Sequence, residues 1–174
     1  MHPVTIACDI DGVLAPISLE PDLTTTIELP RVNHGTHVLL AGIRALKMWH
    51  HLGAVVSWHS TWRPPYTDDL ARTVYLPDFP VFATEDEFLC PEPDERAWWK
   101  LSAIKRWLRD HPDAQTAQLI WIDDDIDDAI REGEISPELL DDPRLKIISP
   151  TPDTGLTAED ITTVTELIEH GLVV

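Results

Sequence analysis

Two carboxylates lie one residue apart near the start of the chain, directly after a short apolar run. Asp9 and Asp11 follow the run that begins at Val4, and Gly12 comes directly after them. Successive side chains on a strand point to opposite faces, so the two acids would share a side if the extended geometry continued. Two acids held this close repel each other, which calls for a hard cation, a nearby lysine or one raised pKa. Asp and Gly also form turns, so a plain β-turn is the alternative interpretation.

A second group of acids follows another apolar run. Residues 119–122 are predicted to form a strand, and Asp123, Asp124 and Asp125 come directly after it. Mg²⁺ prefers oxygen ligands and keeps several waters, so one or two of these carboxylates would suffice to bind it. The later acids of this stretch could instead favour the N-terminus of the helix that follows.

The elements that position these acids alternate between strand and helix. Apolar runs predict strands at residues 4–8, 54–58, 119–122 and 144–148, with a possible edge strand at 79–83 that contains Pro80. Helical spacing predicts helices at residues 36–52, 65–75, 97–109 and 158–170, with a short helix through Ala129 and Ile130. Residues 15–35 and 84–95 are expected to be irregular, and Thr157 and Asp160 resemble a capping box before the last helix.

This alternation predicts an α/β fold with a mainly parallel central sheet that helices cover on both faces. The length fits a single domain over residues 1–174. In such a sheet the ligand crevice lies at the carboxyl ends of the strands, where both groups of acids are expected.

The net charge of −18 limits the classes of binding partner that the chain is expected to have. It disfavours an extended contact with a nucleic-acid backbone, which needs clustered Lys and Arg. The two cysteines, Cys8 in the first strand and Cys90 in a loop, do not indicate a disulfide framework. No run of 18 apolar residues and no basic-then-apolar leader is present, so we expect a cytoplasmic protein with no membrane contact.

The string Asp9-Ile-Asp11-Gly12 after a strand resembles the first motif of the haloacid dehalogenase-like (HAD) phosphohydrolases. The resemblance implies a three-layer Rossmann-like HAD fold and a Mg²⁺-dependent phosphatase. It implies that Asp9 is the nucleophile, which becomes a transient aspartyl phosphate, and that Asp11 is the general acid and base. It also implies that Mg²⁺ is bound by Asp9 and the backbone carbonyl of Asp11, with Asp123 as a direct ligand and Asp124 acting through water.

The same resemblance implies a hydroxyl and a lysine at the site. The hydroxyl is expected just beyond the second strand, where Ser60 is the first choice and Thr61 the alternative. A hydroxyl donates to a phosphoryl oxygen without adding charge. The lysine is expected near the start of the helix before the second acids, where Lys100 matches better than Lys105, which lies roughly 140° further round the helix. A cation at this position would partly neutralise the aspartates.

Other residues near these motifs have two interpretations each. Arg63 would either clamp a substrate phosphate or pair with the acidic surface. Four tryptophans adjoin the expected hydroxyl and lysine, and they would either form a stacking platform for a base or pack in the core and the cleft. These tryptophans are Trp58, Trp62, Trp98 and Trp99.

A narrower resemblance rests on three strings: Trp58-His-Ser-Thr-Trp62, the Asp123-Asp124 pair, and Thr154-Gly-Leu-Thr157. They resemble a compact HAD subgroup found alone or in RNA-repair-associated proteins. Residues 15–35 and 64–96 show no folded insert, so the cap is expected to be minimal or absent and the site open. An open site would admit a phosphorylated small molecule such as a nucleotide, or the terminal phosphate of a nucleic acid. The alternative is a catalytically inactive HAD-like module that binds metal or protein; the pathway and the oligomeric state stay open.

Overall fold

A four-stranded sheet, in which all neighbouring strands are parallel, forms the centre of the fold. The computed structural model describes residues 3–18, 23–32, 35–89, 99–113 and 117–170. The strands of the sheet lie in the order β4-β1-β5-β6, with β1 (Thr5–Cys8), β4 (Val55–Trp58), β5 (Leu119–Ile122) and β6 (Leu145–Ile148). The helices are α1 (Leu40–His51), α2 (Tyr66–Val74), α3 (Glu85–Leu89), α4 (Trp99–Asp110), α5 (Ile126–Arg131), α6 (Pro137–Leu140) and α7 (Ala158–His170). Two further strands, β2 (Thr24–Ile27) and β3 (Thr36–Leu39), pair as a separate antiparallel ribbon.

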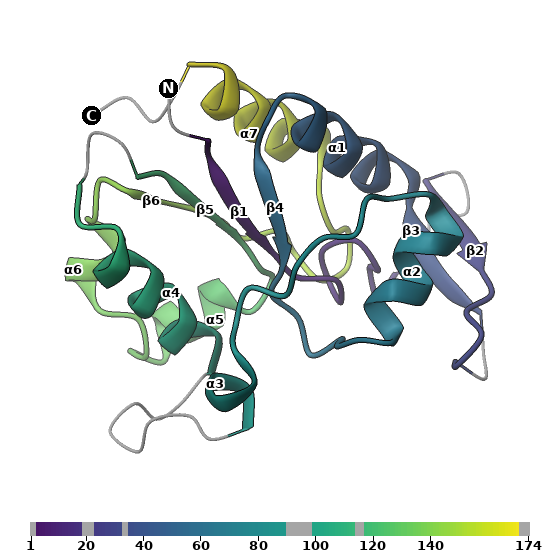
Figure 1. The fold of residues 1–174 in the computed structure, drawn as a ribbon, viewed down its shortest axis with the longest axis horizontal. Coiled ribbons are helices and arrows are strands. Elements are labelled where there is room, and N and C mark those ends of the chain that lie inside the picture. Colours follow the sequence, from purple (N-terminus) through teal and green to yellow (C-terminus); the bar gives the residue numbers. More distant parts are fainter. Residues whose placement is uncertain (1–2, 19–22, 33–34, 90–98, 114–116, 171–174) are drawn as a thin grey trace.

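Alternate residues of the central strands enter two different cores. In β5, Ile120 and Ile122 pack with the apolar residues of α1 and α7. Leu119 and Trp121, which point the other way, pack with those of α4, α5 and α6. Figure 1 shows α1 and α7 side by side on one face and the other three helices on the opposite face. Because side chains on a strand alternate, a strand buried on both faces must be apolar throughout. The parallel sheet with helices on both faces confirms the predicted three-layer α/β fold.

The predicted helix over residues 36–52 is wrong at its start. Residues 36–39 form β3, which pairs with β2 inside the stretch expected to be irregular. The helix itself runs from Leu40 to His51. Thr36 and Val38 are β-branched, and β-branched residues favour strands when a partner strand is at hand. The helical spacing that begins at Leu39 gives no sign of β2, because strand pairing across the ribbon is a tertiary contact.

The possible edge strand at residues 79–83 does not form. The chain there makes only an isolated bridge to β4. The N–H of Trp58 donates to the carbonyl of Pro80, and the N–H of Phe82 donates to the carbonyl of Trp58, each at 2.8 Å. Pro80 has no N–H to extend the ladder, so the pairing stops at these two bonds.

Residues 85–89, expected to belong to a loop, form α3. A capping box begins this helix: the N–H of Glu87 donates to Thr84 Oγ1 at 3.2 Å, and the N–H of Thr84 donates to Glu87 Oε2 at 2.8 Å. The Thr-x-x-Glu spacing in the sequence is typical of a capping box at a helix N-terminus. Residues 90–95 of the same predicted loop lie outside the described residues. The box predicted at Thr157 and Asp160 is confirmed by the same reciprocal bonds, at 2.9 and 3.2 Å.

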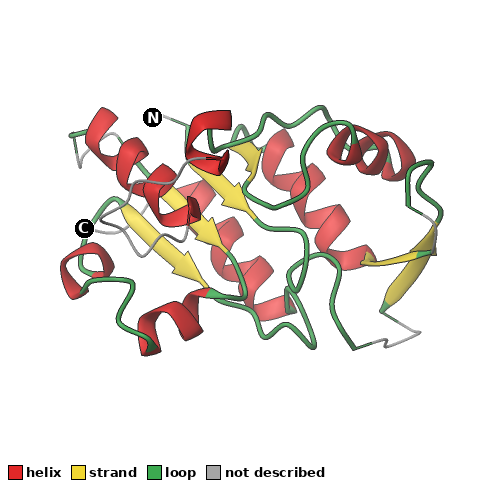
Figure 2. Cartoon of the chain, turned by 90° about the horizontal axis from the view of Figure 1, so that it is seen from below, coloured by secondary structure: helices red, strands yellow, loops and turns green. Residues whose placement is uncertain are grey.

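The described residues between β1 and α1 hold the β2–β3 ribbon and loops. Figure 2 shows this ribbon set apart from the four central strands, which have helices on both sides. An insert of this size agrees with the expectation of a minimal cap. In the described part of the chain, each helix is too short or too polar to cross a membrane.

Candidate active site

The register of the sheet brings the ends of three strands together. Cys8 ends β1 and pairs with the last residues of both β4 and β5. The residues that follow these strands, Asp9, His59 and Asp123, therefore lie at one edge of the sheet. Two backbone bonds extend the pairing: the N–H of Asp9 donates to the Ile122 carbonyl at 2.9 Å, and the N–H of His59 to the Cys8 carbonyl at 2.8 Å. This is the carboxyl edge, where ligands bind in open α/β sheets.

Lys100 holds two of these carboxylates in a buried ion cluster. Its Nζ donates to Asp9 Oδ2 and lies 2.7 Å from Asp123 Oδ2. Only 3% of Lys100 is exposed, and Asp123 is fully buried. Burial by itself would lower the pKa of Lys100, but the charges of Asp123 and Asp9 outweigh burial and raise that pKa. The lysine therefore stays charged and offsets one of the negative charges around it.

Of the two lysines weighed on α4, the structure thus brings Lys100 to the acids. Lys105 is half-buried further along the helix. Lys100 sits in the first turn of α4, which packs across the sheet through Leu101 and Ile104. The apolar face of the helix therefore fixes where the lysine lies.

Asp124 completes a group of three carboxylates. One oxygen each of Asp9, Asp123 and Asp124 lies within 4.8 Å of the others. Three carboxylates at this spacing suit a hard divalent cation with oxygen ligands, so the donor set fits Mg²⁺. Burial raises the pKa of Asp124 to about 6, and the charge of Asp125 adds to the effect. The carboxylate of Asp11 is not part of this group of three.

Gly12 makes room for the Asp124 carboxylate. Its φ is +65°, and a Cβ at this position would collide with the carboxyl group of Asp124. Glycine is therefore needed for two reasons, the left-handed backbone and the close approach of the acid.

Asp11 lies at the exposed side of the site and is held by Trp62. The indole Nε1–H of Trp62 donates to Asp11 Oδ2 at 3.0 Å. Burial and the nearby charge of Asp9 raise the pKa of Asp11, while the bond from Trp62 lowers it. A carboxyl group with a raised pKa next to a second carboxylate is suited to carry a proton. The sequence did not predict this contact.

The two candidate hydroxyls lie in different surroundings. Ser60 is buried, and its Oγ accepts the backbone N–H of Trp62 at 3.2 Å. A hydroxyl that accepts one bond keeps its own hydrogen for another acceptor. Thr61 is exposed and lines a cavity together with Trp62. The role of either hydroxyl in holding a phosphate stays a prediction.

His59 is a site residue that the sequence did not reveal. It is fully buried, and its Nε2 lies 3.0 Å from the backbone carbonyl of Lys100. Burial, followed by the charge of Lys100, lowers the pKa of His59 to about 3. The ring is therefore neutral at physiological pH, and Nε2 must carry the proton to donate to the carbonyl. A histidine at the end of a buried strand, beside the expected hydroxyl, was the available signal.

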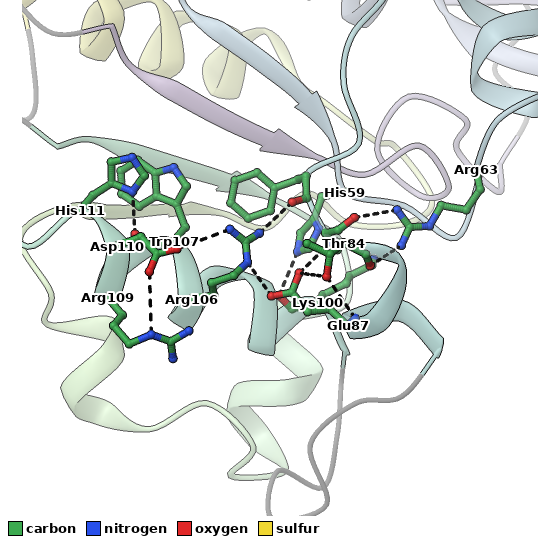
Figure 3. A network of polar contacts seen from close by, with 12 residues as sticks. His59, Arg63, Thr84, Glu87, Lys100, Arg106, Trp107, Arg109, Asp110 and His111 are labelled. Atoms are coloured by element: carbon green, nitrogen blue, oxygen red, sulfur yellow. Dashed lines mark hydrogen bonds and ion pairs between the residues drawn. The ribbon is translucent and has the colours of Figure 1, made fainter.

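Arg63 contacts the segment that leads into α3. Its guanidinium donates to the carbonyls of Ala83 and Thr84 at 3.0 and 3.2 Å and lies 4.3 Å from the centre of the Phe88 ring. Figure 3 shows Arg63 reaching toward Thr84 and Glu87, with Lys100 and His59 beyond them. These bonds occupy two of the five N–H donors of the guanidinium, and the phosphate clamp stays a prediction.

The four tryptophans fall into different environments. Trp58 is buried in the core against Phe79, at 5.4 Å between ring centres. Trp99 is half-buried and packs edge-on against His59 at 5.3 Å. Trp98 lies outside the described residues. Trp62 is half-buried and faces a cavity, so among the described tryptophans it is the one placed to contact a ligand beside Asp11.

Two cavities bear on the location of the site. One of about 270 Å³ is lined by Val32, Thr61, Trp62 and Tyr66 and adjoins Asp11 through Trp62. A larger one of about 460 Å³ has Thr5, Val55 and Trp107 in its lining. Thr5 and Val55 begin their strands, so the larger cavity lies at the amino end of the sheet, away from the aspartates.

The comparisons with known proteins agree with this geometry. The family model described as the HAD domain in Swiss Army Knife RNA repair proteins matches residues 5–161. The matched stretch contains every candidate residue discussed above. No curated protein matches the chain.

Proposed function

The chain belongs to the family of HAD domains found in Swiss Army Knife RNA repair proteins, and on that premise we propose that it is a Mg²⁺-dependent phosphomonoesterase. Membership places the chain among HAD-type phosphohydrolase domains. The metal, an aspartyl-phosphate intermediate and the substrate are our proposal.

The buried cluster of Lys100, Asp9 and Asp123 is the main support. Burying three charged side chains is costly unless each is paired and hydrogen-bonded. A cluster of this kind at the ligand edge of the sheet is typical of a functional site, where perturbed ionisation is common. Asp124 adds a third carboxylate within reach of the same point.

The reaction would take place in two steps. In the first, a carboxylate oxygen of Asp9 attacks phosphorus, the bond to the leaving oxygen breaks, and protonated Asp11 gives its proton to that oxygen. In the second, Asp11 takes a proton from water. The resulting hydroxide attacks the phosphorus, and the bond between phosphorus and Asp9 breaks to release inorganic phosphate. Lys100 orients Asp9, and Ser60 is the first choice to donate to a phosphoryl oxygen.

Asp9, Asp123 and Asp124 would hold the metal, with the backbone carbonyl of Asp11. Bound Mg²⁺ would offset negative charge on the phosphoryl oxygens. The contacts favour Asp124 over Asp123 as the direct ligand, the reverse of the order expected from the sequence. Asp123 Oδ2 already faces Lys100, and Asp123 Oδ1 accepts the N–H of Asp125 at 3.2 Å.

The substrate class follows from the openness and the charge of the chain. We propose a nucleotide or the terminal phosphate of a nucleic acid. A cap no larger than the β2–β3 ribbon would admit a bulky phosphoester. The net charge of −18 disfavours a grip on a long nucleic-acid backbone but does not disfavour removal of one terminal phosphate.

Phosphate release from p-nitrophenyl phosphate and from 5′- and 3′-phosphorylated nucleotides and oligonucleotides tests the proposal. We expect turnover with Mg²⁺, none with EDTA, and none in Asp9→Asn. Asp141→Asn is the matched control, because Asp141 is exposed and lies just before β6, at the other end of the sheet. A folded, metal-loaded protein with no turnover on any substrate would contradict the proposal and favour a catalytically inactive metal- or protein-binding module.

A further inference from the structure

A small cavity is lined in part by Trp62, whose indole is bonded to the residue proposed to protonate the leaving group. Its described lining consists of Val32, Thr61, Trp62 and Tyr66, and its volume is about 270 Å³. None of these side chains is charged, and two are aromatic. Ligand pockets typically span roughly 300–1,000 Å³, so this cavity suits one ring system of a substrate better than a whole molecule.

Trp62 connects the cavity to the proposed chemistry. Its indole Nε1–H is bonded to Asp11 Oδ2 at 3.0 Å, and the same side chain forms part of the cavity wall. Asp11 must lie within hydrogen-bonding reach of the leaving oxygen to protonate it. A group attached to that oxygen therefore leaves the site next to Trp62.

The cavity walls are made by two segments that are separate in the sequence. Val32 follows β2, in the stretch that precedes β3, whereas the other three residues belong to the turn after β4 and the start of α2. Tyr66 is 43% exposed, so its ring is accessible to a ligand. Thr61 and Tyr66 each carry a hydroxyl that could bond the polar edge of a heterocycle.

We propose that this cavity receives the base of a phosphorylated nucleoside whose phosphate is held at Asp9. This inference rests on the proposed phosphatase function and specifies its leaving group. A nucleobase combines a flat π-face, which stacks on Trp and Tyr, with a polar edge. An extended polynucleotide fits less well, because the chain carries a net charge of −18 and a backbone contact needs clustered cations.

Adenosine 5′-monophosphate and ribose 5-phosphate form the decisive substrate pair. Both release the same 5′-oxygen, and they differ in the presence of the base. Loss of one base–aromatic stack weakens binding by roughly 5- to 150-fold, so we expect kcat/KM to be at least about fivefold higher for the nucleotide. Equal values for the two substrates, with Mg²⁺-dependent turnover of both, would overturn the base site while leaving the phosphatase in place.

Variants at Tyr66 assign the effect to the cavity. Tyr66→Leu keeps an apolar side chain but removes the ring, so we expect it to lower kcat/KM for the nucleotide more than kcat/KM for ribose 5-phosphate. Tyr75→Leu is the matched control, since Tyr75 is 85% exposed and caps the other end of α2. Two results would contradict the inference. One is an equal loss of kcat/KM on both substrates in Tyr66→Leu, and the other is the same decrease in nucleotide preference in Tyr75→Leu.

A binding measurement separates the two proposals if no turnover is seen. Calorimetric titration of Asp9→Asn with each compound measures the base contribution without catalysis. A dissociation constant at least about fivefold lower for the nucleotide supports the base site even if the phosphatase proposal fails. A ratio near one overturns the base site.

Discussion

Gly12 lies directly against the carboxylate of Asp124, although the two residues follow different strands of the sheet. The contact is so close that a Cβ on residue 12 would collide with the acid. The turn after β1 and the acidic turn after β5 are therefore fitted to each other. Glycine at this position is required by the close approach of Asp124, a proposed metal ligand, as much as by the turn.

Gly12→Ala should lower both the affinity for Mg²⁺ and the free energy of unfolding, and the loss of affinity should exceed that in a glycine variant with only the backbone strain. The left-handed φ of +65° costs an alanine about 1–2 kcal/mol, and the collision displaces Asp124 in addition. Gly133→Ala is the control, because Gly133 has a similar φ of +76° and nothing lies within 4 Å of the place its new methyl group would take. Calorimetric Mg²⁺ titration and urea unfolding of both variants would separate the two costs. Equal Mg²⁺ affinity in the two variants would contradict the prediction.

Lys100→Met should destabilise the protein strongly in the absence of metal. The substitution leaves Asp9 and Asp123 buried without their cation, and breaking a buried pair costs about 3–5 kcal/mol. A divalent cation should restore part of this loss, since it replaces the missing positive charge. The measurement is the free energy of unfolding in urea, with EDTA and with Mg²⁺. Lys105→Met, on the same helix, is the comparison; a similar loss there, or no effect of Mg²⁺ on Lys100→Met, would count against the cluster as described.

The two neighbouring aspartates after β5 should respond differently to amide substitution. If Asp124 is the direct ligand, Asp124→Asn reduces Mg²⁺ affinity while the fold stays intact. Asp123→Asn removes a charge that faces Lys100 at 2.7 Å, so it should lower the stability as well. Metal titration and thermal unfolding of both variants provide the comparison. Stronger loss of Mg²⁺ affinity in Asp123→Asn would restore the order expected from the sequence.

Trp62→Phe should shift the pH dependence of turnover to higher pH. The indole N–H lowers the pKa of Asp11, so its removal raises that pKa. The proposed first step needs Asp11 protonated, and kcat/KM should therefore stay high to a higher pH before it falls. Trp107→Phe makes the same change at the amino end of the sheet and should leave the profile in place. If kcat/KM of Trp62→Phe falls at the same pH as in the parent, or at a lower pH, the role given to Asp11 is refuted.

His59 should make the protein less stable as the pH falls from about 6.5 toward 3. Its pKa is about 3 in the folded protein, so between these values the unfolded chain binds more protons and unfolding becomes easier as the pH drops. His59→Gln keeps an N–H for the Lys100 carbonyl but does not titrate. From pH 7 to pH 5 the parent should lose roughly 2 kcal/mol more than the variant.

Urea unfolding at both pH values measures this difference. His51→Gln, at an exposed position of α1, is the control. Parallel losses in the parent and His59→Gln would show that His59 does not carry the effect. A retained turnover in His59→Gln, with a loss in His59→Ala, would show that the N–H positions Lys100.

Local signals in the sequence predicted the central elements well. β1 and β5 are short apolar runs that end in acids, and α7 begins at a capping box that the structure confirms. The capping box at Thr84 is an equally local signal, since it depends on a Thr and a Glu three residues apart. The β2–β3 ribbon could not be found this way, because Thr36 and Val38 acquire their strand geometry from a partner across the ribbon.

The sequence by itself determined which residue types end each strand, because apolar periodicity and the order of Asp, Ser and Lys motifs are local properties of the chain. It therefore indicated Asp9, Asp11 and the Asp123-Asp124 pair as candidates, and the resemblance of these motifs to the HAD family added Lys100. Only the tertiary structure decided which of them meet: the register of β1 between β4 and β5 aligns Asp9 with His59 and Asp123. The bond from Trp62 to Asp11 and the bond from His59 to the Lys100 carbonyl depend on that alignment, since each joins segments that are neighbours only in the folded sheet.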